Sequence, residues 1–98
     1  MSLQEHWFYV LYSLKDHKLY KGFCSNPLSR YYSHFNGGTI STRRRRPLVL
    51  IYIRRFDSKS EAMQYERFSK SLEGGVQLRQ ELILLGIINA SGKLSSDG

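Results

Sequence analysis

The 98-residue sequence contains little sulfur and little negative charge. Its one cysteine, Cys24, cannot form an internal disulfide, and it cannot supply the several thiolates that a cysteine-based zinc finger requires. Eight Asp or Glu residues stand against 15 Lys or Arg residues, which gives a formal net charge of +7. This imbalance favours a polyanionic partner, because contacts to phosphate supply most of the affinity for nucleic acid. A soluble basic protein with no such partner would have the same composition.

Long apolar runs are also missing from the sequence. No stretch reaches the roughly 18 uncharged apolar residues of a membrane span, and the start MSLQEHW lacks the basic and apolar regions of a secretory signal. We therefore expect a cytoplasmic protein with no membrane partner. The length predicts a single domain over residues 1–88, and the small polar residues 89–98 predict a disordered tail.

Three β-rich segments predict a small sheet. Residues 7–14 and 18–23 are separated by residues 15–17, which have the length of a hairpin loop. Residues 48–56, LVLIYIRRF, form a third run rich in β-branched and aromatic side chains.

Two further segments carry helix start signals. Asn26 and Pro27 fit the N-cap and the first position of a helix, and residues 58–61, SKSE, fit a capping box. The pair Gly74-Gly75 is expected to interrupt this second helix. In a last amphipathic helix we expect core contacts from Val76, Leu82, Ile83 and Leu85. The order β-β-α-β-α-α predicts an α/β (α+β) fold in which helices flank a mixed or antiparallel three-stranded sheet.

The first predicted helix has two distinct sides. Arg30 and His34 lie four residues apart and therefore project together, a cation beside an imidazole. Two solvated side chains would show the same spacing. A different side carries an apolar stripe that we expect to face the core, formed by Leu28, Tyr31, Tyr32 and Phe35.

Three residues of the predicted hairpin are candidates for a site. Tyr20 and Gly22 share one face of the second strand, and Tyr9 on the first strand could lie beside Tyr20. Because glycine has no side chain, Gly22 allows a ligand or another backbone to approach closely. Tyrosines that only fill a core would give the same pattern.

Glu66 stands at the border of the apolar stripe of the second helix. Its carboxylate could be solvated, could pair with Lys70 at i+4, or could hold a metal ion. Mg²⁺ is often bound by one or two carboxylates together with waters and substrate phosphate, so one glutamate suffices in principle.

Consecutive arginines in the loop TRRRRP are the strongest local electrostatic feature. Their mutual repulsion is tolerable where they meet phosphates, so we expect nucleic-acid contacts here, with a localisation signal as the alternative. The predicted contact residues are Lys21, Arg43, Arg44, Arg45 and Arg46.

Taken in order, these residues resemble the GIY-YIG endonuclease domain family, in particular its small stand-alone members and the nuclease half of UvrC. The resemblance runs from about residue 7 to residue 85. The second motif corresponds to YKG, Tyr20-Lys21-Gly22, and the first corresponds to WFY, of which only Tyr9 matches GIY. The register VLY at residues 10–12 would leave too short a hairpin before Tyr20. The family's helix arginine, its downstream Tyr or His, and its metal-binding glutamate fall on Arg30, His34 and Glu66.

The resemblance implies a metal-dependent endonuclease that hydrolyses DNA phosphodiester bonds, for which repair or recombination would be a fitting setting. It implies one divalent ion, Mg²⁺ or Mn²⁺, on Glu66, and no small-molecule cofactor. Arg30 would bind the scissile phosphate, and Tyr9 or Tyr20 would orient or deprotonate the attacking water. His34 would pass a proton or hold a tyrosine. Two alternatives remain: a non-catalytic nucleic-acid-binding module with the same fold, and a protein-interaction adaptor that uses the last helix.

Overall fold

A three-stranded antiparallel sheet forms the middle layer of the protein. In this computed structural model, which describes residues 5–95, the strands are β1 (His6–Ser13), β2 (Leu19–Cys24) and β3 (Leu48–Phe56). Their order in the sheet is β2-β1-β3, so β1 is central and β2 is an edge strand. The predicted hairpin and the predicted third strand are therefore confirmed, and the sheet is antiparallel throughout.

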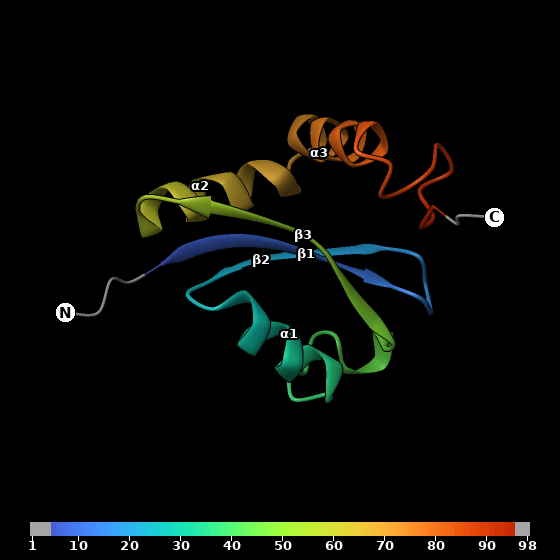
Figure 1. Cartoon of the computed structure of the whole chain (residues 1–98), viewed down its shortest axis with the longest axis horizontal. Helices are drawn as coiled ribbons and strands as arrows, with labels where there is room; N and C mark the ends of the chain where they lie inside the picture. The colour runs from blue at the N-terminus through green and yellow to red at the C-terminus, as the bar shows by residue number, and fades with distance from the viewer. Residues whose placement is uncertain (1–4, 96–98) are drawn as a thin grey trace.

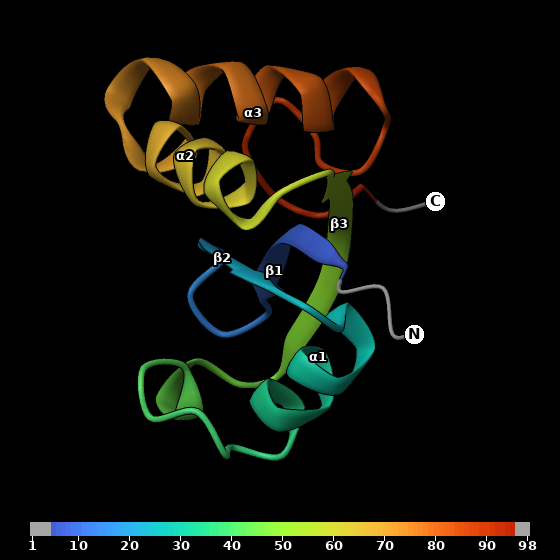
Figure 2. The ribbon, with the colours of Figure 1, turned by 90° about the vertical axis from the view of Figure 1, so that its left-hand side faces the viewer.

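Helices cover both faces of this sheet. Figures 1 and 2 show α2 (Lys59–Lys70) and α3 (Leu72–Leu84) on one face. The other face carries α1 (Pro27–Phe35) and the loop that follows it, which contains the short 3₁₀ helix η1 (Arg43–Arg45). This arrangement confirms the predicted α+β class and the order β-β-α-β-α-α. No helix in the described part of the chain is long and apolar enough to cross a membrane.

Side-chain caps begin the first two helices where the sequence predicts them. Asn26 Oδ1 accepts a hydrogen bond from the backbone N–H of Ser29 at 3.1 Å, and Ser58 Oγ accepts one from Glu61 at 3.2 Å. Each cap satisfies a backbone donor that has no partner inside its helix.

The break between α2 and α3 was predicted at the wrong residue. It lies at Ser71, whose Oγ accepts from the N–H of Gly74 at 3.0 Å, and both glycines belong to α3. A Cβ at Gly74 would lie 1.7 Å from the carbonyl oxygen of Phe68. Glycine is needed here because α3 begins in close contact with the last turn of α2, and not because the helix ends there.

The core consists of two clusters, one on each face of the sheet. Toward α2 and α3 the buried residues are Phe8, Val10, Leu78, Leu82 and Ile88, and toward α1 they are Tyr9, Leu11 and Leu48. Of the core contacts predicted for the last helix, Leu82 is buried and Ile83 packs against the first cluster. Val76 and Leu85 are exposed, and Leu78, one turn before Leu82, was missed.

The apolar stripe predicted for the core side of α1 faces solvent for the most part. The exposed fractions are 74% for Leu28, 68% for Tyr32 and 52% for Phe35, whereas His34 is only 4% exposed. Tyr31 alone of the stripe packs on the sheet, where its hydroxyl donates to the carbonyl oxygen of Leu48 at 2.9 Å. Polar contacts made by His34 and Tyr31, rather than the apolar pattern, set the rotation of this short helix.

Residues 89–95 of the expected tail form a tight turn on the core. Asn89 Oδ1 accepts backbone hydrogen bonds from Ser91 and Lys93, both within 3.1 Å. Leu94 pairs with Ile88 in an isolated β-bridge and packs against the first core cluster. Residues 96–98 lie outside the described part of the chain.

Candidate active site

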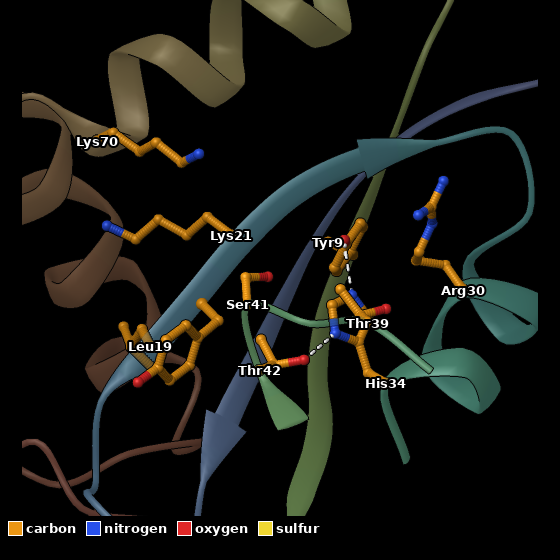
Figure 3. Close-up of a pocket in the computed structure, with 10 residues that line it drawn as sticks. Tyr9, Leu19, Lys21, Arg30, His34, Thr39, Ser41, Thr42 and Lys70 are labelled. Carbon is orange, nitrogen blue, oxygen red and sulfur yellow. Dashed lines mark hydrogen bonds between the residues drawn. The ribbon is translucent and has the colours of Figure 1, made fainter. Parts of the chain in front are cut away.

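A cavity of about 430 Å³ lies beside the edge strand β2 and brings together four of the five predicted catalytic residues, Tyr9, Tyr20, Arg30 and His34. Within residues 5–95, no Asp or Glu side chain lines it. Figure 3 shows that the lining comes from the hairpin, from α1, from the following loop and from the end of α2. The lining residues are Tyr9, Leu19, Tyr20, Lys21, Arg30, His34, Thr39, Ser41, Thr42 and Lys70.

Gly22 makes room for the ring of Tyr9. The two residues are paired across β1 and β2, and a Cβ at position 22 would lie 2.5 Å from Tyr9 Oη and 2.7 Å from Cζ. The sequence suggested that a ligand or another backbone would approach this glycine. The structure instead places the tyrosine side chain over it, which fixes where the hydroxyl points.

A chain of hydrogen bonds links Tyr9 to the interior of the loop. Its hydroxyl lies 3.1 Å from His34 Nε2, and His34 Nδ1 lies 2.6 Å from Thr42 Oγ1. Figure 3 shows both contacts. The chain can carry its protons in either of two directions, because each ring nitrogen meets a hydroxyl that can donate or accept. Thr42 could not be predicted from the sequence, since nothing in the spacing of a loop threonine marks it as a partner of a helix histidine.

Burial holds both members of the Tyr9–His34 pair in their neutral forms at neutral pH. It raises the pKa of Tyr9 above 10.0, although the nearby Arg30 guanidinium acts in the opposite direction. It also lowers the pKa of His34 below 6.5, and here the positive charge of Arg30 adds to the effect. A neutral imidazole therefore faces a protonated phenol.

Arg30 lines the cavity together with Tyr9 and His34 (Figure 3). Its side chain is exposed, and the two ion pairs found within residues 5–95 involve other residues. The predicted neighbourhood of Arg30 and His34 on one side of α1 is thus observed. An exposed guanidinium with no carboxylate partner is suited to bind a phosphate group.

Glu66 does not line the cavity directly. Its carboxylate is paired with Lys70 at 3.3 Å, the i+4 contact that the sequence offered as an alternative to metal binding. The side chain is 17% exposed, and its negative charge contributes to the raised pKa of Tyr9. The carboxylate therefore lies on α2, outside the cavity that Tyr9 lines. Within residues 5–95 there is no group of three or more His, Cys, Asp or Glu side chains that could hold a metal ion.

Tyr20 lines the cavity but does not join the Tyr9–His34 chain. Its hydroxyl donates to Asp16 Oδ2 at 2.5 Å, and the same carboxylate oxygen lies 3.5 Å from Arg45 Nε. Across the strands Tyr20 faces Leu11, whereas Gly22 faces Tyr9. Tyr9 and Tyr20 therefore lie on the same face as diagonal neighbours, and Tyr20 packs against the cluster that contains Tyr9. Of the two tyrosines it is Tyr9 that meets His34.

Lys21 points to the opposite face of the sheet from Tyr9 and binds the end of α2. Its Nζ donates to the carbonyl oxygen of Ser69 at 2.7 Å, a position where the helix dipole favours a cation. Burial and the neighbouring Lys70 lower its pKa. Because Ser69 Oγ donates to the carbonyl oxygen of Glu66, this contact also braces the turn that carries the candidate metal ligand.

The four consecutive arginines form η1 and its exposed C-terminal flank. Arg43 Nε donates to the carbonyl oxygen of Gly37 at 2.8 Å, and Arg46 Nε donates to that of Arg43 at 3.0 Å. Arg45 meets Asp16, and all four side chains are exposed. The predicted basic surface is present, on the loop next to the cavity.

Comparison with known proteins identifies the family. The model of the GIY-YIG catalytic domain matches residues 5–77. Among curated relatives, a UPF0213 protein of Natronomonas pharaonis is 46% identical over 69 residues, which are 69% of this chain and 80% of the relative. A UPF0213 protein of Bacillus licheniformis is 42% identical over 73 residues, 74% of each chain. The UPF0213 protein YazA of Bacillus subtilis is 38% identical over 73 residues, which are 74% of this chain and 73% of YazA. On this evidence the chain belongs to the GIY-YIG family of nuclease domains.

Proposed function

We propose that this protein is a metal-dependent endonuclease that hydrolyses phosphodiester bonds of DNA. The observation that carries the proposal is the Tyr9–His34–Thr42 chain, which lies beside Arg30, a residue with no ion-pair partner among residues 5–95. The Tyr9 hydroxyl is hydrogen-bonded to a buried imidazole and lies next to the Arg30 cation, and none of the described residues adds a carboxylate to the cavity. This arrangement suits an attack by water on a phosphate group. The setting we propose is the cytoplasm, in DNA repair or recombination.

Arg30 binds the scissile phosphate in this mechanism. Negative charge builds up on the non-bridging oxygens as water attacks, and a fixed guanidinium stabilises that charge most in the transition state. Arg30 and Tyr9 line the same cavity (Figure 3), so a phosphate bound by Arg30 would share that cavity with the phenol oxygen.

Tyr9 and His34 then move the proton of the attacking water. A phenol with a raised pKa is a poor base alone, but it can accept a proton from water while it donates its own to His34 Nε2. In this direction His34 Nδ1–H donates to Thr42 Oγ1, which holds the tautomer that keeps Nε2 free to accept. The imidazole is suited to this role because it is neutral before the reaction.

Glu66 is the residue that would hold a divalent ion. One carboxylate, waters and substrate phosphate are a common ligand set for Mg²⁺, and the influence of Glu66 on Tyr9 supports a place for its charge near the site. When bound, Mg²⁺ or Mn²⁺ would polarise a phosphate oxygen and stabilise the leaving 3′-oxygen. Lys70 must release the carboxylate for this to occur, and Lys21 keeps the end of α2 in place.

Cleavage of supercoiled plasmid with and without Mg²⁺ or Mn²⁺ tests the proposal, with Glu66→Ala beside the wild type. The matched control is Glu61→Ala, an exposed glutamate in the first turn of the same helix. We expect metal-dependent nicking by the wild type and by Glu61→Ala, and none by Glu66→Ala, whose DNA binding and thermal stability stay near wild type. Equal cleavage by Glu66→Ala, or cleavage in EDTA, would contradict the assignment.

A second candidate function is a nucleic-acid-binding module without catalysis. The Glu66–Lys70 ion pair favours it, because it occupies the carboxylate that would hold the metal ion, and so does Trp7 in place of the first glycine of GIY. In that case the plasmid would be retained in a salt-sensitive manner but never nicked, and EDTA would have no effect.

A further inference from the structure

The outer side of α1 is apolar and has no partner within the described part of the chain. Leu28, Tyr32 and Phe35 follow one another at i, i+4 and i+7 and are all more than half exposed. These are residues that the sequence pattern assigned to the core. An exposed group of large apolar side chains on a small basic domain calls for a ligand that covers it.

Positive charge surrounds the end of this apolar side. A cavity of about 480 Å³ is lined by Lys15, Phe35, Arg43, Arg44, Arg46 and Pro47, with no carboxylate from the described residues among them. None of the four cations takes part in the ion pairs found within residues 5–95. Arg43 and Arg46 each use Nε for a backbone carbonyl, which leaves the terminal nitrogens available for other contacts.

The combination of an exposed ring with arginines is that of a nucleic-acid contact rather than a protein contact. Bases stack on aromatic side chains, while arginines take the phosphates on either side. A duplex hides the faces of its bases, so such stacking requires an unpaired base. We propose that Phe35 is a stacking platform for an unpaired base of the DNA substrate, with Lys15, Arg43, Arg44 and Arg46 holding the adjacent phosphates.

The platform is continuous with the candidate active site through the chain itself. His34 and Thr42 line the cavity of the candidate active site, whereas their immediate neighbours Phe35 and Arg43 line the second cavity, of about 480 Å³. A DNA strand that passes around this segment would contact both. The inference rests on the proposed nuclease function and adds a substrate class to it: DNA with an unpaired segment next to the scissile bond.

Binding measured without catalysis tests the platform separately from the nuclease activity. The probe is a short fluorescein-labelled DNA strand, alone and annealed to its complement, titrated in EDTA and followed by fluorescence anisotropy. The variant is Phe35→Leu, which keeps an apolar side chain and removes the ring. Its matched control is Phe68→Leu, at another exposed phenylalanine, on α2. A second variant, Phe35→Trp, keeps an aromatic ring at this position.

We expect Phe35→Leu to weaken binding of the single strand by roughly 5- to 100-fold, the range that a lost stacking contact produces. Duplex binding should change less than about twofold, and Phe35→Trp and Phe68→Leu should bind like the wild type. Thermal melting of each variant checks that α1 is intact, since the Phe35 ring lies 6.1 Å from that of Tyr31.

Three results would overturn the inference. The first is unchanged single-strand binding by Phe35→Leu, and the second is an equal loss of affinity for single strand and duplex. The third is sedimentation of the wild type as a dimer and of Phe35→Leu as a monomer, which would make the outer side of α1 a contact between two copies of the chain. Plasmid cleavage by the wild type reports on the proposed function independently. If the wild type cleaves plasmid but Phe35→Leu binds the single strand as well as the wild type does, only the stacking proposal fails. If binding depends on the ring but plasmid is not cleaved, only the proposed nuclease function fails.

Discussion

The two faces of the sheet differ although they are made by neighbouring residues of β1. Phe8 is fully buried beneath α2, and its ring meets that of Tyr65 edge-on at 4.8 Å and that of Tyr52 at 6.2 Å. Tyr9, the next residue, faces α1 and meets the buried imidazole of His34. One side of the strand is used for close apolar packing and the other for a polar chain beside a cavity.

The difference indicates that most of the fold's stability comes from the Phe8 side of the sheet, whereas the Tyr9 side carries the candidate active site. On the side of the sheet that carries Phe8 (the Phe8 face), two helices and the turn at residues 89–95 cover the core cluster. The face that carries Tyr9 is covered by one short helix, α1, and of the large apolar side chains of α1 only Tyr31 packs on the sheet. Burial of apolar area is the main source of stability, so the Phe8 face should dominate the free energy of unfolding.

The sharpest test of the comparison is Phe8→Ala against Leu28→Ala. Phe8→Ala should lower the free energy of unfolding by about 3–5 kcal/mol, which is a large part of the total for a small domain. Leu28→Ala, at a side chain that is 74% exposed, should change it by less than about 0.5 kcal/mol. Urea denaturation followed by circular dichroism measures both. Similar losses of unfolding free energy for the two variants would contradict the larger contribution of the Phe8 face to stability.

A smaller effect on stability but a large one on activity is expected from Gly22→Ala. The added Cβ collides with the Tyr9 ring, which should cost about 1–3 kcal/mol and reduce cleavage about 100-fold through displacement of the hydroxyl. In a Tyr9→Leu background the ring is gone, so the stability cost of Gly22→Ala should fall below about 0.5 kcal/mol. Urea denaturation of the four proteins in this cycle measures the difference. An unchanged cost would show that Gly22 is required by something other than Tyr9.

Acid should weaken the Tyr9 face through His34. The native pKa of His34 lies below 6.5, so the unfolded chain binds a proton more readily than the native protein as the pH falls through that value. Stability is complete above about pH 6.5 and declines below it. The groups that face the imidazole, Tyr9, Arg30 and Thr42, supply no negative charge to offset its protonation. Urea titrations between pH 8 and about pH 5 should show a shallower decline for His34→Gln; equal slopes would contradict this origin.

Alkali should act on the Phe8 face, and more weakly. Tyr52 donates to Glu81 Oε2 at 2.5 Å, and burial together with this carboxylate raises the pKa of Tyr52 from 10.0 to about 12. The stability that this contact adds is present below pH 10 and is lost as the pH rises toward 12. Tyr52→Phe should cost about 1 kcal/mol near pH 8, and its deficit relative to the wild type should shrink above pH 10. Urea titrations of both proteins at a series of alkaline pH values measure this deficit. A constant deficit would argue against titration of this phenol.

Local signals in the sequence predicted the elements well. The hairpin, the third strand and the caps at Asn26 and Ser58 depend on neighbouring residues and were found as expected. The rotation of α1 was wrong because it depends on contacts that Tyr31 and His34 make with distant segments. The start of α3 was wrong because Ser71 caps it, and the spacing of the glycines does not show which residue is the cap.

The sequence predicts which residues belong to the candidate site, but it does not predict the contacts between them. Arg30 and His34 share a side of one helix, which helical spacing alone reveals. The contact of Tyr9 with Gly22 depends on strand register, and the contact of His34 with Thr42 depends on the path of a loop. Neither can be read from sequence separation, which is why Tyr9 and Tyr20 could not be told apart before.

The family match ends before the last residues that contribute to the hydrophobic core. The match stops at residue 77, inside α3, and the very next residue, Leu78, is buried against the Phe8 cluster. Ile88 and Leu94 close that cluster from further along the chain. The matched segment is therefore not sufficient for the core: a chain cut at residue 77 would expose Phe8 and Val10 on the sheet face that α3 covers. A truncated or fused version of this protein therefore has to keep residues 78–95 if the Phe8 cluster is to stay buried.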